Sequence, residues 1–211
     1  ASVMITVHHL NNSRSQRILW LLEELGLEYE IVHHTRQPIG LAPAELKAIH
    51  PLGKAPIVEI DGYVMAESGA AVELITLRHG RGRLMPDQTA ADYPRYIEML
   101  HYPEGSAAGP LAMMLFGRLF RVENQAYHSY VAGQVELHIG YIDGLLHGRE
   151  FLIGDQFSAA DIQLTFTLQM ARRSKLLEER TELLAYIARM EEREAYKRAI
   201  DKGGPFTLNL R

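Results

Sequence analysis

Two short motifs early in the chain contain groups that could bind an extended, charged molecule. They are His50-Pro51-Leu52-Gly53-Lys54-Ala55-Pro56-Ile57 and Ala66-Glu67-Ser68-Gly69-Ala70. A proline directly before a strand removes one donor from the sheet and can form a cis bond, so the backbone of Ala55 is predicted to pair with something other than protein. Glu67 and Ser68 then add an acid and a hydroxyl at the start of a predicted helix. Such groups are typical of a site for an extended peptide.

Each of these residues also has an ordinary structural interpretation. By itself Pro56 is typical of a turn and Ser68 of a helix cap, while Lys54 and Glu67 are typical solvated charges. The occurrence of all of them in this order favours a binding site.

The hydrophobic pattern around the motifs predicts an α/β domain. The predicted elements are a strand over 5–10, a helix through 18–25, a strand over 29–32, a short helix over 43–49, strands over 57–60 and 63–66, and a helix over 68–79. Gly26 is placed to end the first helix, and Asp61-Gly62 is placed to turn a two-residue antiparallel hairpin. A strand, a helix and a strand with short connections imply a parallel pair. The order is therefore a βαβ unit followed by a ββα unit.

The rest of the chain predicts an all-helical second domain. Gly80-Arg81-Gly82-Arg83 breaks the pattern, so we predict domains over 1–80 and 89–211 joined by a linker over 81–88. Helices are predicted over 93–100, 111–120, 127–146, 159–170 and 183–193. Interruptions are expected near Pro103 and Pro110. Ser158 and Asp161 are spaced as a capping box, which is a role in stability.

Composition excludes several classes of function. The 211 residues are 47% hydrophobic, and the net charge of -4 with scattered Lys and Arg gives no footprint for nucleic acid. The absence of cysteine excludes disulfides, thiolate metal sites and a protein thiol nucleophile. His8-His9 and His33-His34 are strand neighbours that point to opposite faces, so no metal site is predicted. Since no leader pattern or membrane-length apolar run is visible, we expect a cytoplasmic protein without a membrane span.

The motifs and the order of elements resemble those of the cytosolic glutathione transferases. The resemblance rests on His-Pro-Leu-Gly-Lys-Ala-Pro, Glu-Ser-Gly-Ala and Ser-Ala-Ala-Asp, and it covers nearly the whole chain. Ser-Arg-Ser-Gln-Arg and His101-Tyr102-Pro103-Glu104-Gly105-Ser106 resemble a branch shared by bacterial and fungal members. The resemblance implies an α/β thioredoxin-like N-terminal domain, an all-α helical-bundle C-terminal domain, glutathione as co-substrate and a homodimer.

The resemblance also implies a role in glutathione binding for each residue of the two motifs. Ala55, before a cis Pro56, would offer its N–H and C=O to the cysteinyl backbone of glutathione. Ser68, with the start of a helix behind it, would bind the γ-glutamyl carboxylate, where the helix dipole favours negative charge. Glu67 would accept the γ-glutamyl ammonium, and Lys54 would face the glycyl carboxylate.

The residue that activates the glutathione thiol is open among neighbours in the first loop. In serine-type members a serine just after the first strand donates to the sulfur, and Ser13, which precedes Arg17 by four residues, stands in the matching place. Asn12 matches if the register moves by one, and Ser15 is the third candidate. The loop has no tyrosine and the chain no cysteine, which counts against tyrosine-type members and excludes cysteine-type ones. All three candidates could instead cap the helix.

The implied reaction is attack by the bound thiolate on an electrophilic carbon, or on a peroxide oxygen, of a second substrate. By family position, the electrophile site is predicted at Leu10, Arg14, Tyr102 and Met113, although an aromatic such as Tyr102 is also typical of core packing. Two functions stay open. One is a glutathione transferase with peroxidase or dehalogenase side activity, and the other is a non-catalytic module that binds glutathione, an apolar ligand or a partner protein.

Overall fold

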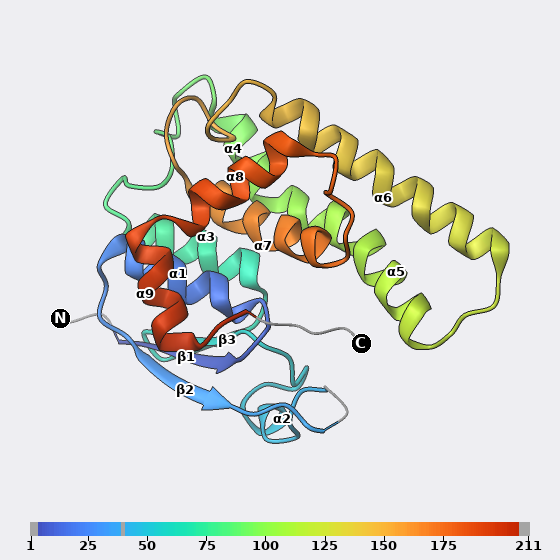
Figure 1. The fold of residues 1–211 in the computed structure, drawn as a ribbon. Helices are drawn as coiled ribbons and strands as arrows, with labels where there is room; N and C mark the ends of the chain where they lie inside the picture. Colours follow the sequence, from blue (N-terminus) through green and yellow to red (C-terminus); the bar gives the residue numbers. More distant parts are fainter. Residues whose placement is uncertain (1–3, 39–40, 207–211) are drawn as a thin grey trace. The chain divides into compact units, whose positions relative to one another are not determined.

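The computed structural model describes residues 4–38 and 41–206 (Figure 1). By their internal contacts these residues form two compact units. One contains the described residues up to Arg83 and those from Glu191 onward, and the other runs from Leu84 to Met190. The domain boundaries predicted from the sequence stay a prediction. The last helix groups with the first unit although it follows the second unit along the chain.

The first unit is built on a four-stranded sheet in the order β2-β1-β3-β4. The strands are β1 (Ile5–Leu10), β2 (Glu30–His34), β3 (Ile57–Ile60) and β4 (Tyr63–Met65). β1 and β2 are parallel, whereas β3 is antiparallel to both β1 and β4. This topology confirms the predicted βαβ and ββα units, with the second strand displaced by one residue at its start and two at its end.

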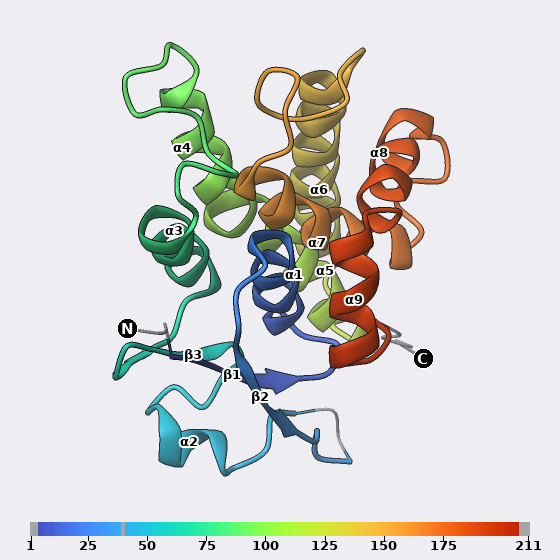
Figure 2. The same cartoon turned by 90° about the vertical axis from the view of Figure 1, so that its left-hand side faces the viewer.

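Helices cover both faces of this sheet (Figure 2). They are α1 (Ser15–Leu25), α3 (Ser68–His79) and α9 (Glu194–Gly203) on one face, and the short α2 (Leu46–Ile49) on the other. Because α1 contacts both α3 and α9 as well as β1, nearly all of its residues are buried. Gly26 ends α1 with a φ of 64°, as the sequence predicts.

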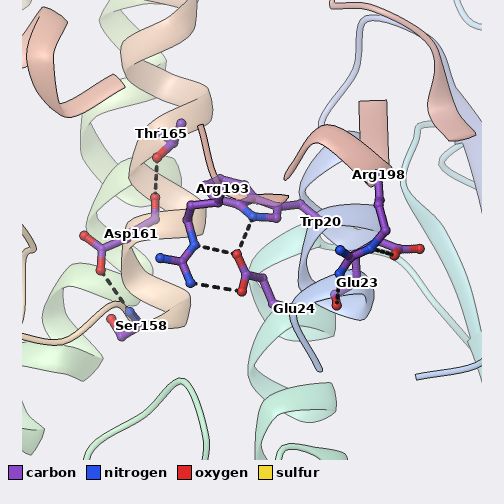
Figure 3. A network of polar contacts seen from close by, with 8 residues as sticks. All are labelled: Trp20, Glu23, Glu24, Ser158, Asp161, Thr165, Arg193 and Arg198. Carbon is purple, nitrogen blue, oxygen red and sulfur yellow. Dashed lines mark hydrogen bonds and ion pairs between the residues drawn. The ribbon is translucent and has the colours of Figure 1, made fainter. Parts of the chain in front are cut away.

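Helix α9 lies beyond the last helix predicted from the sequence, and its packing on α1 holds it in the first unit. The rings of Trp20 and Tyr196 meet edge to face, with centroids 5.1 Å apart. Arg193, just before α9, donates to Glu24 at 2.6 Å, and the indole N–H of Trp20 donates to the same carboxylate at 3.0 Å (Figure 3). These contacts join segments that are far apart in the sequence.

A second ion-pair cluster ties α1 to α9 and is expected to respond to pH. Burial alone would raise the pKa of Glu23, but hydrogen bonds from Lys202, Tyr29 and Arg198 outweigh it and hold this pKa below its ordinary value of 4.5. The stabilisation by this carboxylate is therefore present above the ordinary pKa and is lost as the pH falls through the folded-state pKa.

We expect Glu23→Gln to lower the free energy of unfolding by about 2 kcal/mol at neutral pH, because a hydrogen bond to a charged group contributes about 1.5–3 kcal/mol. The difference between variant and wild type should be smaller at an acidic pH below the folded-state pKa of Glu23, where the wild-type carboxyl is also protonated. Urea unfolding followed by the fluorescence of Trp20, the single tryptophan of the chain, measures both values. A difference that is the same at both pH values would contradict this prediction.

The second unit is helical. Its elements are α4 (Tyr93–Tyr102), a π-helical segment η1 (Pro103–Ala107), α5 (Ala108–Leu119), α6 (Gln125–Leu146), α7 (Ala159–Arg173) and α8 (Thr181–Glu191). The predicted interruption near Pro103 is wrong, because α4, η1 and α5 follow one another without a break. Pro103 begins the π-helical segment, in which the N–H of Ala108 donates to the Pro103 carbonyl, and Pro110 is the third residue of α5. The interruption predicted near Pro110 is therefore wrong as well. Among the described residues, no helix is long and apolar enough to span a membrane.

Helix α7 is the buried centre of this unit, and its start is fixed by Asp161 (Figure 3). The carboxylate accepts the backbone N–H of Ser158 at 2.9 Å, which is the contact that the predicted capping box requires. It also accepts the N–H of Leu152 at 3.0 Å and the hydroxyl of Tyr186 at 2.6 Å. Asp161 is fully buried. Through these hydrogen bonds its carboxylate connects Leu152, in the segment before α7, to Tyr186 of α8.

Candidate functional site

The sheet register brings the two sequence motifs to the same end of the first unit. In the β3–β4 hairpin Val58 pairs with Met65, so the chain that enters β3 and the chain that leaves β4 lie at one end. β1 is antiparallel to β3, with His8 opposite Ile57, so β1 also ends there with Leu10. The loop after β1, the loop before β3 and the start of α3 are thus neighbours.

The loop that enters β3 contains backbone groups that are available for further hydrogen bonds. The peptide bond between Ala55 and Pro56 is cis. Pro56 is buried, Ala55 is half-buried and Lys54 is exposed. Within the described parts of the chain, the N–H and C=O of Ala55 have no backbone hydrogen-bond partner and Lys54 forms no ion pair. These are the groups that an extended ligand with a carboxylate would require.

The start of α3 combines an unusual backbone with a buried hydroxyl. Glu67 has φ 70° and ψ 104°, a strained combination for a residue with a side chain, and its side chain is exposed. Ser68 is the first residue of the helix rather than its cap and is only 5% exposed. The N-terminal amides of α3 and the Ser68 hydroxyl therefore form a site suited to an anion, with the Glu67 carboxylate beside it.

Arg17 holds the Ser68 hydroxyl, and the sequence analysis did not assign it this role. Its Nη2 donates to Ser68 Oγ at 2.8 Å. Arg17 is a residue of α1 and is buried. A hydroxyl has one hydrogen and two lone pairs. Because Arg17 occupies a lone pair, the hydrogen of Ser68 is left to donate to an incoming anion. The available sequence signal was a charged residue directly before the apolar helix predicted through 18–25.

The loop after β1 contains the three candidates for thiol activation. Asn12 has a left-handed backbone with φ 56°, and its carbonyl accepts from Arg36 at 2.8 Å. Ser13 is 9% exposed, and its Oγ lies 2.6 Å from Ser15 Oγ and accepts the N–H of Ser15 at 3.2 Å. Ser15 is fully buried and is the first residue of α1. The positive end of α1 therefore lies directly behind Ser13.

The four residues predicted for an electrophile site are divided between the two units. Leu10 is buried at the end of β1 and Arg14 is half-buried at the start of α1, whereas Tyr102 ends α4 and Met113 is 38% exposed on α5. Burial, and to a lesser degree Tyr141, raises the pKa of Tyr102 to about 12. The hydroxyl is therefore protonated at neutral pH and lies 2.7 Å from Nδ1 of His138. The joint role of these residues stays a prediction.

The histidines of the sheet form hydrogen-bonded networks. His8 lies 2.7 Å from a carboxylate oxygen of Glu59 and 3.1 Å from Nε2 of His34, which in turn lies 2.9 Å from Glu45. This chain of contacts connects the segment before α2 to the sheet. Among the described residues there is no group of three or more His, Asp or Glu that could hold a metal ion.

Comparison with known protein families matches both parts of the chain. Residues 2–76 match the model described as "Glutathione S-transferase, N-terminal domain", and residues 99–194 match the "Glutathione S-transferase, C-terminal domain". The two matched segments contain every glutathione-site candidate named above and the candidates Tyr102 and Met113.

Individual relatives agree with the family models. The chain is 32% identical to Glutathione S-transferase 3 of Schizosaccharomyces pombe over 98% of this chain and 91% of the relative. It is 34% identical to Glutathione S-transferase 1 of Saccharomyces cerevisiae over 80% and 81% of the two chains. A crystal structure of a glutathione S-transferase from Actinobacillus pleuropneumoniae superposes with a TM-score of 0.90 at 31% identity, covering 98% of this chain and 95% of that one.

Proposed function

The chain belongs to the glutathione S-transferase family, and we propose that its first unit binds glutathione and uses Ser13 to hold the glutathione thiol as a thiolate. The thiolate then attacks an electrophilic small molecule. The observation that carries this proposal is the position of the loop after β1, the cis-proline loop and the start of α3 at one end of the same sheet.

Glutathione is an extended tripeptide with two carboxylates, one ammonium and one thiol, and each has a matching group in this site. Ala55 would pair with the cysteinyl backbone as an added strand does. Ser68 and the amides of α3 would bind the γ-glutamyl carboxylate, while Glu67 would accept the ammonium. Lys54, which has no ion-pair partner among the described residues, would bind the glycyl carboxylate.

Thiol activation requires a moderate amount of free energy. A thiol with a pKa near 8.5 is mostly protonated at neutral pH, and lowering this pKa by ~2 units requires roughly 2.7 kcal/mol. A hydroxyl donor at Ser13 and the positive end of α1 are both suited to stabilise the anion. The protein supplies proximity and a stabilised thiolate, and no covalent enzyme intermediate forms.

The second substrate is proposed to be a hydrophobic electrophile or a peroxide. Transfer of glutathione to such a compound is a detoxification reaction. A non-catalytic binding module is the alternative. The ultraviolet difference spectrum of bound glutathione separates the two, because an enzyme should show thiolate absorbance at neutral pH and a passive binder should not.

We also propose a cytoplasmic homodimer, for which sedimentation at micromolar concentration gives the oligomeric state.

Isothermal titration with glutathione, combined with a conjugation assay on a generic aromatic halide, tests the proposal. Binding with turnover is the expected result. Binding with turnover of a peroxide alone would assign a peroxidase, and binding without thiolate absorbance or turnover would support the binding module. Absence of binding at millimolar glutathione would contradict the assigned site.

We expect Arg17→Met to weaken glutathione binding about fivefold to tenfold, because Ser68 then lacks the donor that orients its hydroxyl and a hydrogen bond contributes about 0.5–1.5 kcal/mol. Methionine retains most of the buried volume. Titration calorimetry measures the affinity, with Arg78→Met at an exposed position of α3 as control. Equal affinity in the folded Arg17 variant and wild type would contradict this role.

A further inference from the structure

A chain of buried hydrogen bonds lies behind Ser13 and ends at α9. Ser13 Oγ is 2.6 Å from Ser15 Oγ, and Ser15 Oγ is 2.7 Å from Nδ1 of His9. The other ring nitrogen of His9, Nε2, is 2.8 Å from the carbonyl oxygen of Gly203. His9 is 1% exposed and Ser15 is fully buried, so the chain is closed to water beyond Ser13.

The hydrogen positions in this chain follow from its two ends. A carbonyl oxygen can only accept, so Nε2 of His9 carries a hydrogen that it donates to Gly203. Burial lowers the pKa of His9, and the nearby His33 and His34 lower it further, against the opposing effect of the Gly203 hydrogen bond. The ring is therefore neutral at neutral pH, and its Nδ1 is an acceptor.

The acceptor at His9 determines the direction of both hydroxyls. Ser15 has one hydrogen and three neighbours that could accept it, which are Ser13 Oγ at 2.6 Å, Nδ1 of His9 at 2.7 Å and the Leu10 carbonyl at 3.1 Å. Because Nδ1 of His9 carries no hydrogen, the 2.7 Å contact is a hydrogen bond only if Ser15 donates it. The 2.6 Å contact between the serines must then be made by the hydrogen of Ser13. In the protein without ligand, Ser13 thus donates inward and presents a lone pair, not a hydrogen, to an arriving thiol.

We propose that His9 is a positioning residue for thiol activation, which acts through Ser15 to set the direction of the Ser13 hydroxyl and takes up the proton that the bound thiol loses. This inference rests on the proposed function, because it assumes that glutathione presents its thiol to Ser13.

The proton transfer balances within the chain. The S–H bond breaks with its electron pair left on sulfur, and the proton passes to Ser13 Oγ. Ser13 gives its own proton to Ser15 Oγ, and Ser15 gives its proton to Nδ1 of His9. The result is a thiolate that accepts a hydrogen bond from Ser13 and an imidazolium at His9, with no change in net charge. The thiolate at the other end of the chain favours the charged ring electrostatically.

Residues of α1 and α9 pack closely around the His9 ring. A Cβ on Gly203 would lie 2.9 Å from Nε2 of His9 and 2.6 Å from a side-chain carbon of Leu19, so α9 can approach this near only through a glycine. From β2, the titratable groups that act on His9 are His33, whose ring centroid is 5.7 Å away, and His34. From α1 and α9, the groups in hydrogen-bond contact are the Ser15 hydroxyl and the Gly203 carbonyl.

The number of protons released per thiolate tests the inference. Thiolate is measured by ultraviolet absorbance, and proton release by calorimetry of glutathione binding in two buffers of different ionisation enthalpy. For the wild type at neutral pH we expect thiolate with almost no proton release. For His9→Phe and for Ser15→Ala we expect one proton per thiolate, and a pH midpoint of thiolate formation raised by about one unit, which is a tenfold lower ratio of thiolate to thiol.

Controls separate a positioning role from a structural one. S-methylglutathione has no thiol proton, so its affinity should be equal in wild type, His9→Phe and Ser15→Ala if these fold normally. His33→Phe changes the neighbouring histidine and should release no more protons than the wild type. Should His9→Phe fail to fold, Ser15→Ala alone decides, because it cuts the chain but retains His9 and its bond to Gly203.

The outcomes also distinguish this inference from the proposed function. Release of one proton per thiolate by the wild type would overturn the inference, since Ser13 would then simply rotate towards the sulfur. If Ser13→Ala raised the midpoint but His9→Phe and Ser15→Ala did not, the inference would fail and the proposed function would stand. If Ser13→Ala left the midpoint unchanged, the assignment of Ser13 itself would fail.

Discussion

Ser13→Ala should reduce kcat/KM for conjugation about 100-fold, because removal of one preorganised donor to a developing or stabilised anion typically costs about 10²–10³ in rate. The reason is local, since the variant lacks the only group proposed to donate directly to the sulfur. The pH–rate profile should move to higher pH, as less thiolate forms at neutral pH. Steady-state rates with an aromatic halide across the pH range measure both effects.

S-methylglutathione and two further variants test whether the loss of rate in Ser13→Ala comes from the missing hydrogen bond to the thiolate. Affinity for S-methylglutathione should change less than about twofold, because no hydrogen bond to a thiolate is involved. Ser129→Ala, at an exposed position of α6, is the matched control for loss of a serine hydroxyl. A large loss of rate in Asn12→Ala with an unchanged profile in Ser13→Ala would transfer the role to Asn12.

Asp161→Ala should lower the free energy of unfolding by about 3–5 kcal/mol, because three buried donors lose their charged acceptor at once. One of these donors is the Tyr186 hydroxyl, whose pKa is raised by burial and by the adjacent Asp161 carboxylate, so it remains a donor. Chemical unfolding followed by the helical circular dichroism signal measures the change.

The matched control for this prediction is Asp155→Ala, which lies in the same connection before α7 but is exposed. Its effect should stay within about 0.5 kcal/mol, as is usual for surface positions. Asp161→Asn should also be strongly destabilised, since its amide nitrogen would face one of the donors. A loss below about 1 kcal/mol in Asp161→Ala would show that the network carries little of the stability.

The order of the secondary-structure elements followed from local patterns. The alternation along β1, the helical spacing through α1 and the turn residues Asp61-Gly62 each depend on a few neighbours in the chain, and the structure has each where it was predicted. Boundaries were less accurate where local rules compete. The segment 43–45 precedes α2 instead of belonging to it, and Pro103 was taken as an interruption because its role in a π-helical turn depends on the helix around it.

The sequence by itself determined the sheet and helices of the first unit up to residue 79, the helical character of the second and the identity of the motifs Lys54-Ala55-Pro56 and Glu67-Ser68. Only the tertiary structure decided which buried groups support these motifs. Arg17 contacts Ser68 across 51 positions, and His9 contacts Gly203 across 194. No local periodicity encodes such pairs, because they form only when packed helices bring distant polar groups together and burial forces each group to find a partner.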